Sequence, residues 1–206
     1  MRAGHLIYKV DNLDESVKEW RNKGFAVEYG KAKNPYNAII YFSDGPYIEL
    51  LAATGMPKCF KVLLNYIGYK GVVKRFDSWD YGAERWCGFC IEKEPGDLKV
   101  EIDSLGKYKE KGLYMKNAKR KDTYGRELKF KCFFPADLSL PFLMSYFNID
   151  PKPLNFVHPN GYERVAKITF ATTAESSKII RELLDDPIVE IVVTGEPGVV
   201  KEVTFA

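Results

Sequence analysis

The chain is poor in the residues that hold disulfide-rich or metal-rich proteins together, because its 206 residues include only four cysteines and two histidines. Four cysteines are too few for a disulfide scaffold at this length. The formal net charge is only +3, which gives no general argument for binding nucleic acid or a membrane surface. No apolar run approaches the roughly 18–20 residues that cross a bilayer, and residues 1–10 show no signal-peptide pattern. These absences favour a cytoplasmic protein.

Apolar and aromatic residues are abundant by contrast. Hydrophobic residues make up 46% of the chain, and tyrosine and phenylalanine number 13 each. A chain of this length can bury a core as one large domain or two small ones. Many aromatic residues suit strands and aromatic-lined pockets. The composition therefore indicates a globular protein with room for a pocket.

Residues 1–57 have the pattern of one strand, one helix and three strands. The apolar strand at 5–10 is followed by Asn12, a helix N-cap with Glu15 three residues later. Gly24 is expected to end this helix. Further strands are predicted at 25–29, 37–42 and 47–51. This first module is βαβββ.

The same order of elements recurs along the chain. After a helical insertion at 58–83, with Phe60, Leu63, Leu64 and Ile67 on one side, residues 84–150 repeat the βαβββ pattern. Residues 151–206 contain a His-Pro-Asn-Gly turn, which follows Asn155 and Phe156, and a partial third βαββ module. An internal repeat predicts architecture before function. We expect an α+β fold in which tandem βαβββ modules form a cupped, mostly antiparallel sheet around a cleft.

Two polar residues stand in otherwise apolar strands. His5 begins the first strand, and Glu49 lies inside the segment 45–51. A buried carboxylate is costly without a partner, and a histidine on a neighbouring strand supplies one, either as an ion pair or as a fellow metal ligand. Because side chains alternate along a strand, Tyr47 shares a face with Glu49. We predict Tyr47 and Asn37 as substrate-binding residues, with ordinary packing as the alternative.

Several segments resemble one known family. These are His5-Leu6-Ile7-Tyr8 with Asn12-Leu13-Asp14, the strand 37–42, Gly45-Pro46-Tyr47-Ile48-Glu49-Leu50, Leu140-Pro141-Phe142 and His158-Pro159-Asn160-Gly161. Together with the tandem βαβββ pattern, they resemble the glyoxalase-like domain family of the vicinal oxygen chelate superfamily. That superfamily includes glyoxalases, extradiol dioxygenases and bleomycin-resistance proteins. The resemblance spans almost the whole chain, but it indicates fold more than reaction.

The resemblance implies a metal site between two modules, each giving a histidine and a glutamate. Carried over by position, His5 and Glu49 fall on ligand positions, whereas Gly88 and Met144 occupy the other two and cannot bind a hard divalent ion. If the turn at His158 folds over the cleft, His5, Glu49 and His158 would hold Fe, Mn, Ni or Zn and leave positions open for substrate. The alternative is a hydrogen-bonded His5–Glu49 pair in a metal-free pocket.

The chemistry that would follow is lyase, isomerase or dioxygenase chemistry assisted by the metal. Glu49 is the predicted general base. Glu92 is a second candidate, although a solvated carboxylate at a strand edge is the better interpretation of that residue. A non-catalytic protein that binds or sequesters a small molecule without metal is the competing hypothesis.

Two other patterns carry less weight. Residues 86–90 have the sequence Trp-Cys-Gly-Phe-Cys, which matches the thioredoxin motif, but a strand there would lack the helix dipole that activates Cys87. Residues 107–131 hold ten lysines and arginines. Lys119 with Lys121, or Lys129 with Lys131, could attract an anionic substrate. Single-stranded nucleic acid is a weaker hypothesis, because charged edge strands are common.

The sequence thus predicts a protein that binds a small oxygenated, and in one version anionic, molecule in a cleft. No membrane partner is expected, and nucleic acid is disfavoured. The sequence does not determine the oligomeric state, although the sheet edge of the third module is compatible with a homodimer.

Overall fold

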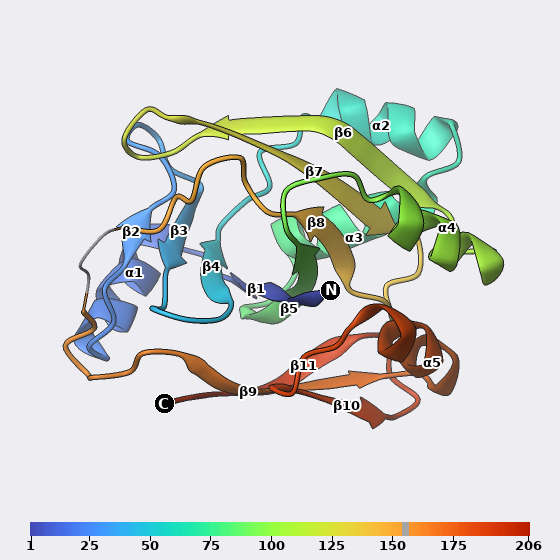
Figure 1. The fold of residues 1–206 in the computed structure, drawn as a ribbon. Coiled ribbons are helices and arrows are strands. Elements are labelled where there is room, and N and C mark those ends of the chain that lie inside the picture. Colours follow the sequence, from blue (N-terminus) through green and yellow to red (C-terminus); the bar gives the residue numbers. More distant parts are fainter. Residues whose placement is uncertain (154–156) are drawn as a thin grey trace.

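A computed structural model describes residues 1–153 and 157–206. These residues form five helices and eleven strands (Figure 1). None of the described helices is long and apolar enough to cross a membrane. Asn155 and Phe156, at the start of the predicted turn, lie outside the described residues.

The first βαβββ unit forms as the sequence predicts. Its elements are β1 (Arg2–Lys9), α1 (Leu13–Asn22), β2 (Glu28–Tyr29), β3 (Asn37–Ile40) and β4 (Tyr47–Leu51). Helix α1 begins where expected because the Asn12 side chain accepts hydrogen bonds from the backbone N–H groups of Asp14 and Glu15. Gly24 follows the helix with φ of +81°, a conformation that glycine adopts without strain.

The insertion consists of two helices, α2 (Lys58–Tyr66) and α3 (Lys70–Tyr81). Of the apolar residues predicted on one side, Leu64 is buried, but Phe60, Leu63 and Ile67 are 39%, 50% and 53% exposed. Helix α3 has the larger structural role, because Phe76 and Trp79 pack into the second core of the protein.

The second unit repeats the first in element order. It contains β5 (Arg85–Lys93), α4 (Lys99–Lys107), β6 (Gly112–Lys121), β7 (Glu127–Pro135) and β8 (Phe142–Ser145). The strands of both units join in one sheet with the order β2-β3-β4-β1-β5-β8-β7-β6. Its pairings are antiparallel except for β1 with β4 and β5 with β8.

The sheet curls into a half-barrel, with β6 and β7 passing over β1 and β5 in the view of Figure 1. Its two ends are tied together by side chains. Arg120 on β6 donates to the Gly30 carbonyl just after β2, at 3.3 Å, and the Thr123 hydroxyl donates to the Tyr29 carbonyl. The predicted α+β fold with a cupped, mostly antiparallel sheet is confirmed.

The third unit forms a separate small sheet. It comprises β9 (Val165–Thr172), α5 (Ala174–Leu183), β10 (Val189–Val193) and β11 (Val199–Phe205), with β9 in the middle. Thr173 caps α5 by accepting from the Ser176 backbone N–H. Strands β10 and β11 are both edges, so the homodimer stays a prediction.

The two faces of the large sheet pack into two different hydrophobic clusters. Leu6 belongs to a cluster that also contains residues of α1, α4, α5 and β9. The next residue, Ile7, belongs to a second cluster with residues of α3, β7 and β8. Alternation along β1 thus directs neighbouring side chains into different cores. The concave face of the sheet, on the side of the second cluster, holds the candidate site.

Candidate functional site

A cleft of about 310 Å³ lies on the concave face. Its polar lining includes His5 of β1, Asn37 of β3, Glu49 of β4, and Lys119 and Arg120 of β6. Much of its wall is apolar and aromatic, formed by Tyr36, Tyr47, Phe76, Trp79, Phe130, Phe134, Phe142 and Phe147. A mostly apolar hollow with a few convergent polar groups is the usual form of a small-molecule site.

His5 and Glu49 meet because β1 and β4 are parallel neighbours. Their register places His5 beside Tyr47 and Ile7 beside Glu49, so both polar side chains project from the same face of the sheet. Nε2 of His5 lies 3.8 Å from Oε2 of Glu49. The predicted pairing of these two residues is therefore present in the structure.

His5 is held rigidly and without charge. Its ring stacks on Tyr47, with centroids 4.6 Å apart, and meets the edge of Phe142 at 5.2 Å. Burial, helped by the charge of Arg120, lowers the pKa of His5 to about 3. The imidazole is therefore neutral at neutral pH, and its buried Nδ1 has no hydrogen-bond partner among the described residues.

Glu49 has a polar partner on the opposite side from His5. The Asn37 amide Nδ2 donates to Oε1 of Glu49 at 2.6 Å. Burial raises the pKa of Glu49, while the Asn37 hydrogen bond and the charge of Arg120 act in the opposite direction. The result is a carboxyl group at the cleft that accepts a proton more readily than an exposed glutamate.

Arg120 lines the cleft, although the sequence analysis did not single it out. Burial acts to lower its pKa, but Tyr47, Tyr41 and Glu49 outweigh that effect and raise it. Its guanidinium also lies 5.1 Å from the centre of the Phe147 ring. Arg120 thus places a permanent positive charge on the cleft beside a neutral histidine.

Comparison with known proteins shows the family. The model of a family described as a glyoxalase-like domain matches residues 4–184. The chain belongs to the glyoxalase-like domain family. This range includes both βαβββ units and the cleft between them.

Solved structures with the same fold are distant in sequence. A hypothetical protein from Staphylococcus aureus aligns with a TM-score of 0.64 at 14% identity, over 97% of this chain and 88% of that one. The 2,3-dioxygenase LapB from Pseudomonas sp. KL28 aligns with a TM-score of 0.55 at 14% identity, over 99% of this chain and 74% of LapB. At such identities the likeness shows the fold alone.

A different likeness is confined to part of the chain. The mRNA interferase toxin RelE of Escherichia coli (strain K12) is 30% identical over 73 residues, which is 35% of this chain and 73% of the toxin. The glyoxalase-like match covers much more of the chain and agrees with the sheet topology. The family assignment therefore rests on that match.

The third predicted metal ligand, His158, does not reach the cleft. Its Nδ1 accepts from the Ala26 backbone N–H at 2.8 Å, and its ring packs against Phe25 and Phe42. Both phenylalanines belong to the first hydrophobic cluster, away from the concave face. The condition for a His5–Glu49–His158 set, a turn folded over the cleft, is not met, because the turn packs against the end of α1 instead.

Backbone contacts of the turn explain this position. The Asn160 backbone N–H donates to the Gly24 carbonyl at 3.1 Å, and the Asn160 amide donates to the Lys23 carbonyl. Gly24 permits the close approach, because a Cβ at that position would lie 2.8 Å from Cβ of Asn160. The end of α1 therefore anchors the His-Pro-Asn-Gly turn.

The donor set of the cleft does not fit a metal held by protein side chains. His5 and Glu49 are two donors, but the described residues contain no group of three or more histidine, cysteine, aspartate or glutamate side chains placed to bind one ion. Gly88 cannot be replaced by a ligand without movement, since a Cβ there would lie 2.9 Å from Cδ1 of Ile7. Arg120 adds a positive charge that opposes a cation.

Glu92 is buried, contrary to the interpretation as a solvated edge carboxylate. It is 4% exposed, and its Oε1 accepts from Nε of Arg2 at 3.3 Å. Burial raises the pKa of Glu92 to about 7, although Arg2 opposes the shift. Glu92 lines a separate cavity of about 510 Å³, which shares Tyr47 with the cleft.

The cysteine motif lies in strand β5, as the sequence argument required. Burial raises the pKa of Cys87 to about 12, so its thiolate is scarce at neutral pH. The Trp79 indole donates to the Cys87 carbonyl at 2.9 Å. Cys87 therefore lacks the lowered thiol pKa that activates redox cysteines.

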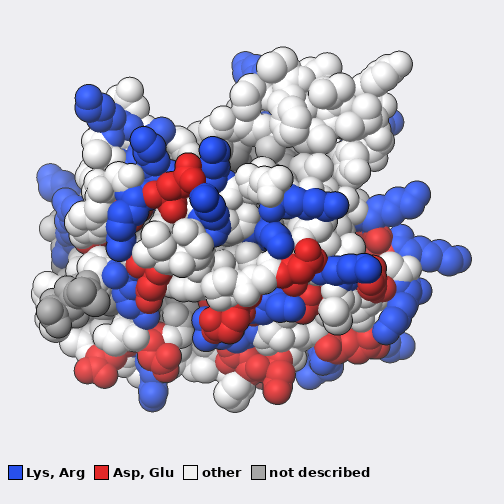
Figure 2. Space-filling model, turned by 45° about the horizontal axis from the view of Figure 1, so that its top comes forward, with Lys and Arg blue, Asp and Glu red and all other residues white. Residues whose placement is uncertain are grey.

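The basic stretch on β6 and β7 is interspersed with acidic groups. Lys119 and Lys129 lie 3.6 and 3.5 Å from the Glu127 carboxylate, and Lys131 lies 3.5 Å from Asp97. Figure 2 shows blue and red side chains intermingled on the face that it presents. These pairs suit a solvated strand surface better than a continuous groove for nucleic acid.

Proposed function

We propose that the cleft binds a small organic anion with an aromatic or apolar body and adjacent oxygens, and that it does so without a resident metal. The observation that supports this most is Arg120, a half-buried cation that lines the same largely apolar and aromatic cleft as His5 and Glu49. An arginine in an apolar hollow is well suited to a carboxylate, because its planar donors match two oxygens.

The neighbouring groups suit the rest of such a molecule. The volume of about 310 Å³ accommodates one ring with a short side chain. Trp79, Phe134 and Phe142 form a contiguous aromatic wall with centroid separations of 5.3–6.1 Å. A ring bound there would stack on these side chains while its oxygens approach Arg120 and the neutral His5.

Glu49 would give the cleft a chemical function in addition to binding. A carboxyl group whose pKa is raised by burial is a better general base than an exposed one. Bound beside Glu49, a molecule with an acidic C–H next to a carbonyl would lose that proton to Oε2. The resulting negative charge would lie near Arg120, which lowers its energy.

The experiment compares phenylpyruvate with phenylacetone, which has the same ring and ketone but lacks the carboxylate. Affinities are measured by calorimetry at constant ionic strength, with tryptophan fluorescence as a second signal. We expect phenylpyruvate to bind at least about tenfold more tightly. Arg120→Gln should abolish that preference, whereas Arg164→Gln, an exposed arginine outside the cleft, should retain it.

Equal affinity of the two probes in the wild type, or equal losses in both variants, would reject an anion site at Arg120.

The proton-transfer step has its own test, which is exchange of the phenylpyruvate C3 hydrogens with deuterated solvent. We expect the protein-catalysed part of the exchange to fall by about 10²-fold or more in Glu49→Gln. Unchanged exchange in that variant would leave binding as the function.

A further inference from the structure

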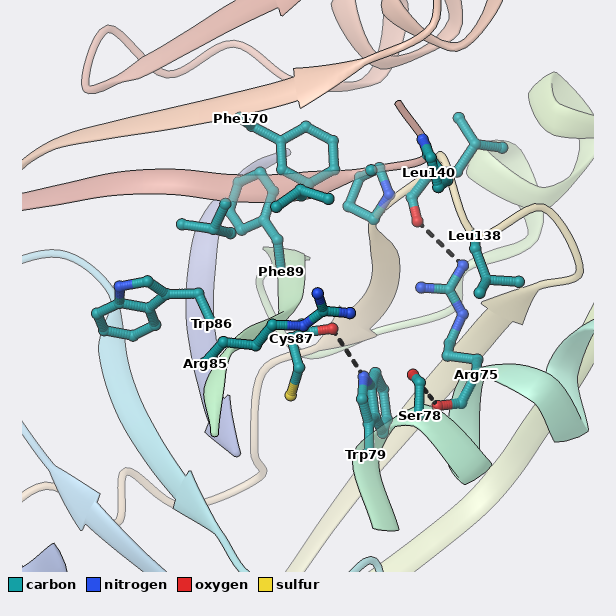
Figure 3. A pocket seen from close by; sticks show the side chains of 16 residues that line it. Arg75, Ser78, Trp79, Arg85, Trp86, Cys87, Phe89, Leu138, Leu140 and Phe170 are labelled. Carbon is teal, nitrogen blue, oxygen red and sulfur yellow. Dashed lines mark hydrogen bonds between the residues drawn. The ribbon is translucent and has the colours of Figure 1, made fainter. Parts of the chain in front are cut away.

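A further, smaller cavity lies between β5 and the three-stranded sheet (Figure 3). Its volume is about 100 Å³, and its walls come from α3, β5, residues 138–141 and residues 197–200. Trp79 lines both this cavity and the cleft. The proposed function makes no use of it.

Arg75 of α3 provides unused hydrogen-bond donors at this cavity. The side chain is 5% exposed, and its Nη2 donates to the carbonyls of Pro135, Asp137 and Leu140. Its Nε is buried without a hydrogen-bond partner, and Nη1 makes no hydrogen bond to any residue that the structure describes. The Nε–H is therefore a buried donor left unsatisfied, which is costly, whereas Nη1 is not fully buried.

Arg85 of β5 brings a second positive charge to the same cavity. In Figure 3 its side chain extends toward Arg75. Neither arginine forms an ion pair within the described part of the chain, and no aspartate or glutamate lines the cavity. One buried and one exposed guanidinium thus line a single hollow that has no carboxylate in its lining, and such a site attracts an anion.

Nearby carboxylates do not fully compensate the positive charge of Arg75. Burial lowers the pKa of Arg75 to about 10, even though Asp137 and Glu110 act to raise it. These two carboxylates are already engaged: Asp137 accepts from Ser139 and Ser176, and Glu110 accepts from the Asp137 backbone N–H. The nearby acids thus offset the buried charge only in part.

The walls of the cavity limit the size of its occupant. Phe89, Phe170 and Leu140 cover it on the apolar side. Gly198 allows the turn before β11 to close against the cavity, because a Cβ there would lie 2.7 Å from the Phe170 ring and 2.8 Å from the Leu138 carbonyl oxygen. A cavity of ~150 Å³ holds benzene, so this smaller one accepts a group of only a few heavy atoms.

We propose that this cavity binds a small oxyanion, of the size of inorganic phosphate or a short carboxylate, between Arg75 and Arg85. The site joins α3 and β5 of the large sheet to the turn that begins β11, so the bound anion links the third unit to the two-module sheet. A purely structural role for Arg75, holding residues 135–140, explains the three bonds from Nη2. It explains neither the unpartnered Nε of Arg75 nor the position of Arg85 at the same cavity.

The test titrates the full chain with inorganic phosphate and, separately, with acetate. Ionic strength is held constant with sodium gluconate, whose anion is too large for the cavity. We expect one saturable site for at least one of the two anions, accompanied by a change in tryptophan fluorescence. Arg85 is exposed, so Arg85→Gln should fold normally and should weaken binding by about tenfold or more.

Two matched variants separate this site from general charge effects and from the cleft. Arg164→Gln removes the same charge elsewhere on the surface and should bind the anion like the wild type. Loss of the saturable binding in Arg120→Gln would instead place the anion in the cleft. The proposal is overturned if the wild type shows no saturable binding up to about 10 mM. It is also overturned if Arg164→Gln loses as much affinity as Arg85→Gln, or if Arg120→Gln is the variant that loses it.

Discussion

The imidazole of His5 lies parallel to the phenol ring of Tyr47, with ring centroids 4.6 Å apart and planes 8° from parallel. Both residues come from adjacent parallel strands and are neighbours in register. Phe142 closes the other side of the imidazole at 5.2 Å. His5 therefore has one orientation, in which Nε2 is directed at Glu49.

Tyr47 variants test whether the stacked ring fixes the orientation of His5. Tyr47→Phe keeps an aromatic ring against His5, so we expect the histidine ring resonances to stay close to those of the wild type. Tyr47→Leu removes the stack and leaves a gap, which should cost about 1–3 kcal/mol in the free energy of unfolding and shift those resonances. Urea unfolding and NMR of the imidazole check both outcomes. Identical ring shifts in Tyr47→Leu would show that Tyr47 does not orient His5.

The Asn37–Glu49 hydrogen bond should control the acidity of Glu49. In Asn37→Ala the 2.6 Å bond to Oε1 is lost; because this bond stabilises the charged form, the pKa of Glu49 should rise further. Loss of a hydrogen bond to a buried charged group costs about 1–3 kcal/mol. NMR titration of glutamate carboxyl carbons measures the shift.

Gly30→Ala provides an independent route to the same change. A Cβ at Gly30 would lie 2.1 Å from Oδ1 of Asn37, so the amide must move. We expect the pKa of Glu49 to rise in this variant too, although Asn37 itself is intact. If only Asn37→Ala shifts the pKa, the Asn37 amide still donates to Glu49 in Gly30→Ala.

The metal content of the purified protein tests directly whether His5 and Glu49 hold a metal ion. Because His5 and Glu49 are two donors beside the positively charged Arg120, we expect less than about 0.1 equivalent of Fe, Mn, Ni or Zn after growth in metal-replete medium, with no uptake on addition of these ions. Elemental analysis is run beside His5→Ala. One equivalent in the wild type that disappears in His5→Ala would restore the metal-dependent hypothesis.

The fold was largely predictable because its signals are local. Alternation along β1 and β4, the Asn12 and Thr173 caps and the repeated order of elements all depend on neighbouring residues. The same alternation brought His5 and Glu49 to one face. Their chemical roles, and those of Asn37 and Tyr47, stay predictions.

Arg120 and His158 show where local signals fail. A register irregularity between Met115 and Ala118 interrupts the alternation on β6, so the face of Arg120 cannot be counted from the start of the strand. Its place on the cleft also requires the sheet to curl until β6 reaches the end of β2. His158 is positioned by backbone contacts of Asn160 at the end of α1, which no pattern in the turn itself indicates.

Glu92 should make stability depend on pH in a predictable direction. Its pKa is raised from 4.5 to about 7 in the folded protein, so between these values the folded state binds the extra proton. Stability from this group is present at low pH and is lost as the pH rises through about 7. A shift of this size corresponds to on the order of 3 kcal/mol.

The comparison of wild type with Glu92→Gln isolates that contribution. His5 has the opposite effect, since its lowered pKa reduces stability as the pH falls below about 6.5, but it is the same in both proteins and cancels in the difference. The variant should gain stability relative to the wild type between pH 4.5 and 8, measured by urea unfolding. Glu94→Gln removes an exposed carboxylate near the same Arg2 and should keep most of the wild-type pH dependence, because burial contributes more than Glu94 to the raised pKa of Glu92. Parallel curves for wild type and Glu92→Gln would mean that Glu92 ionises freely, and that water reaches it despite its burial.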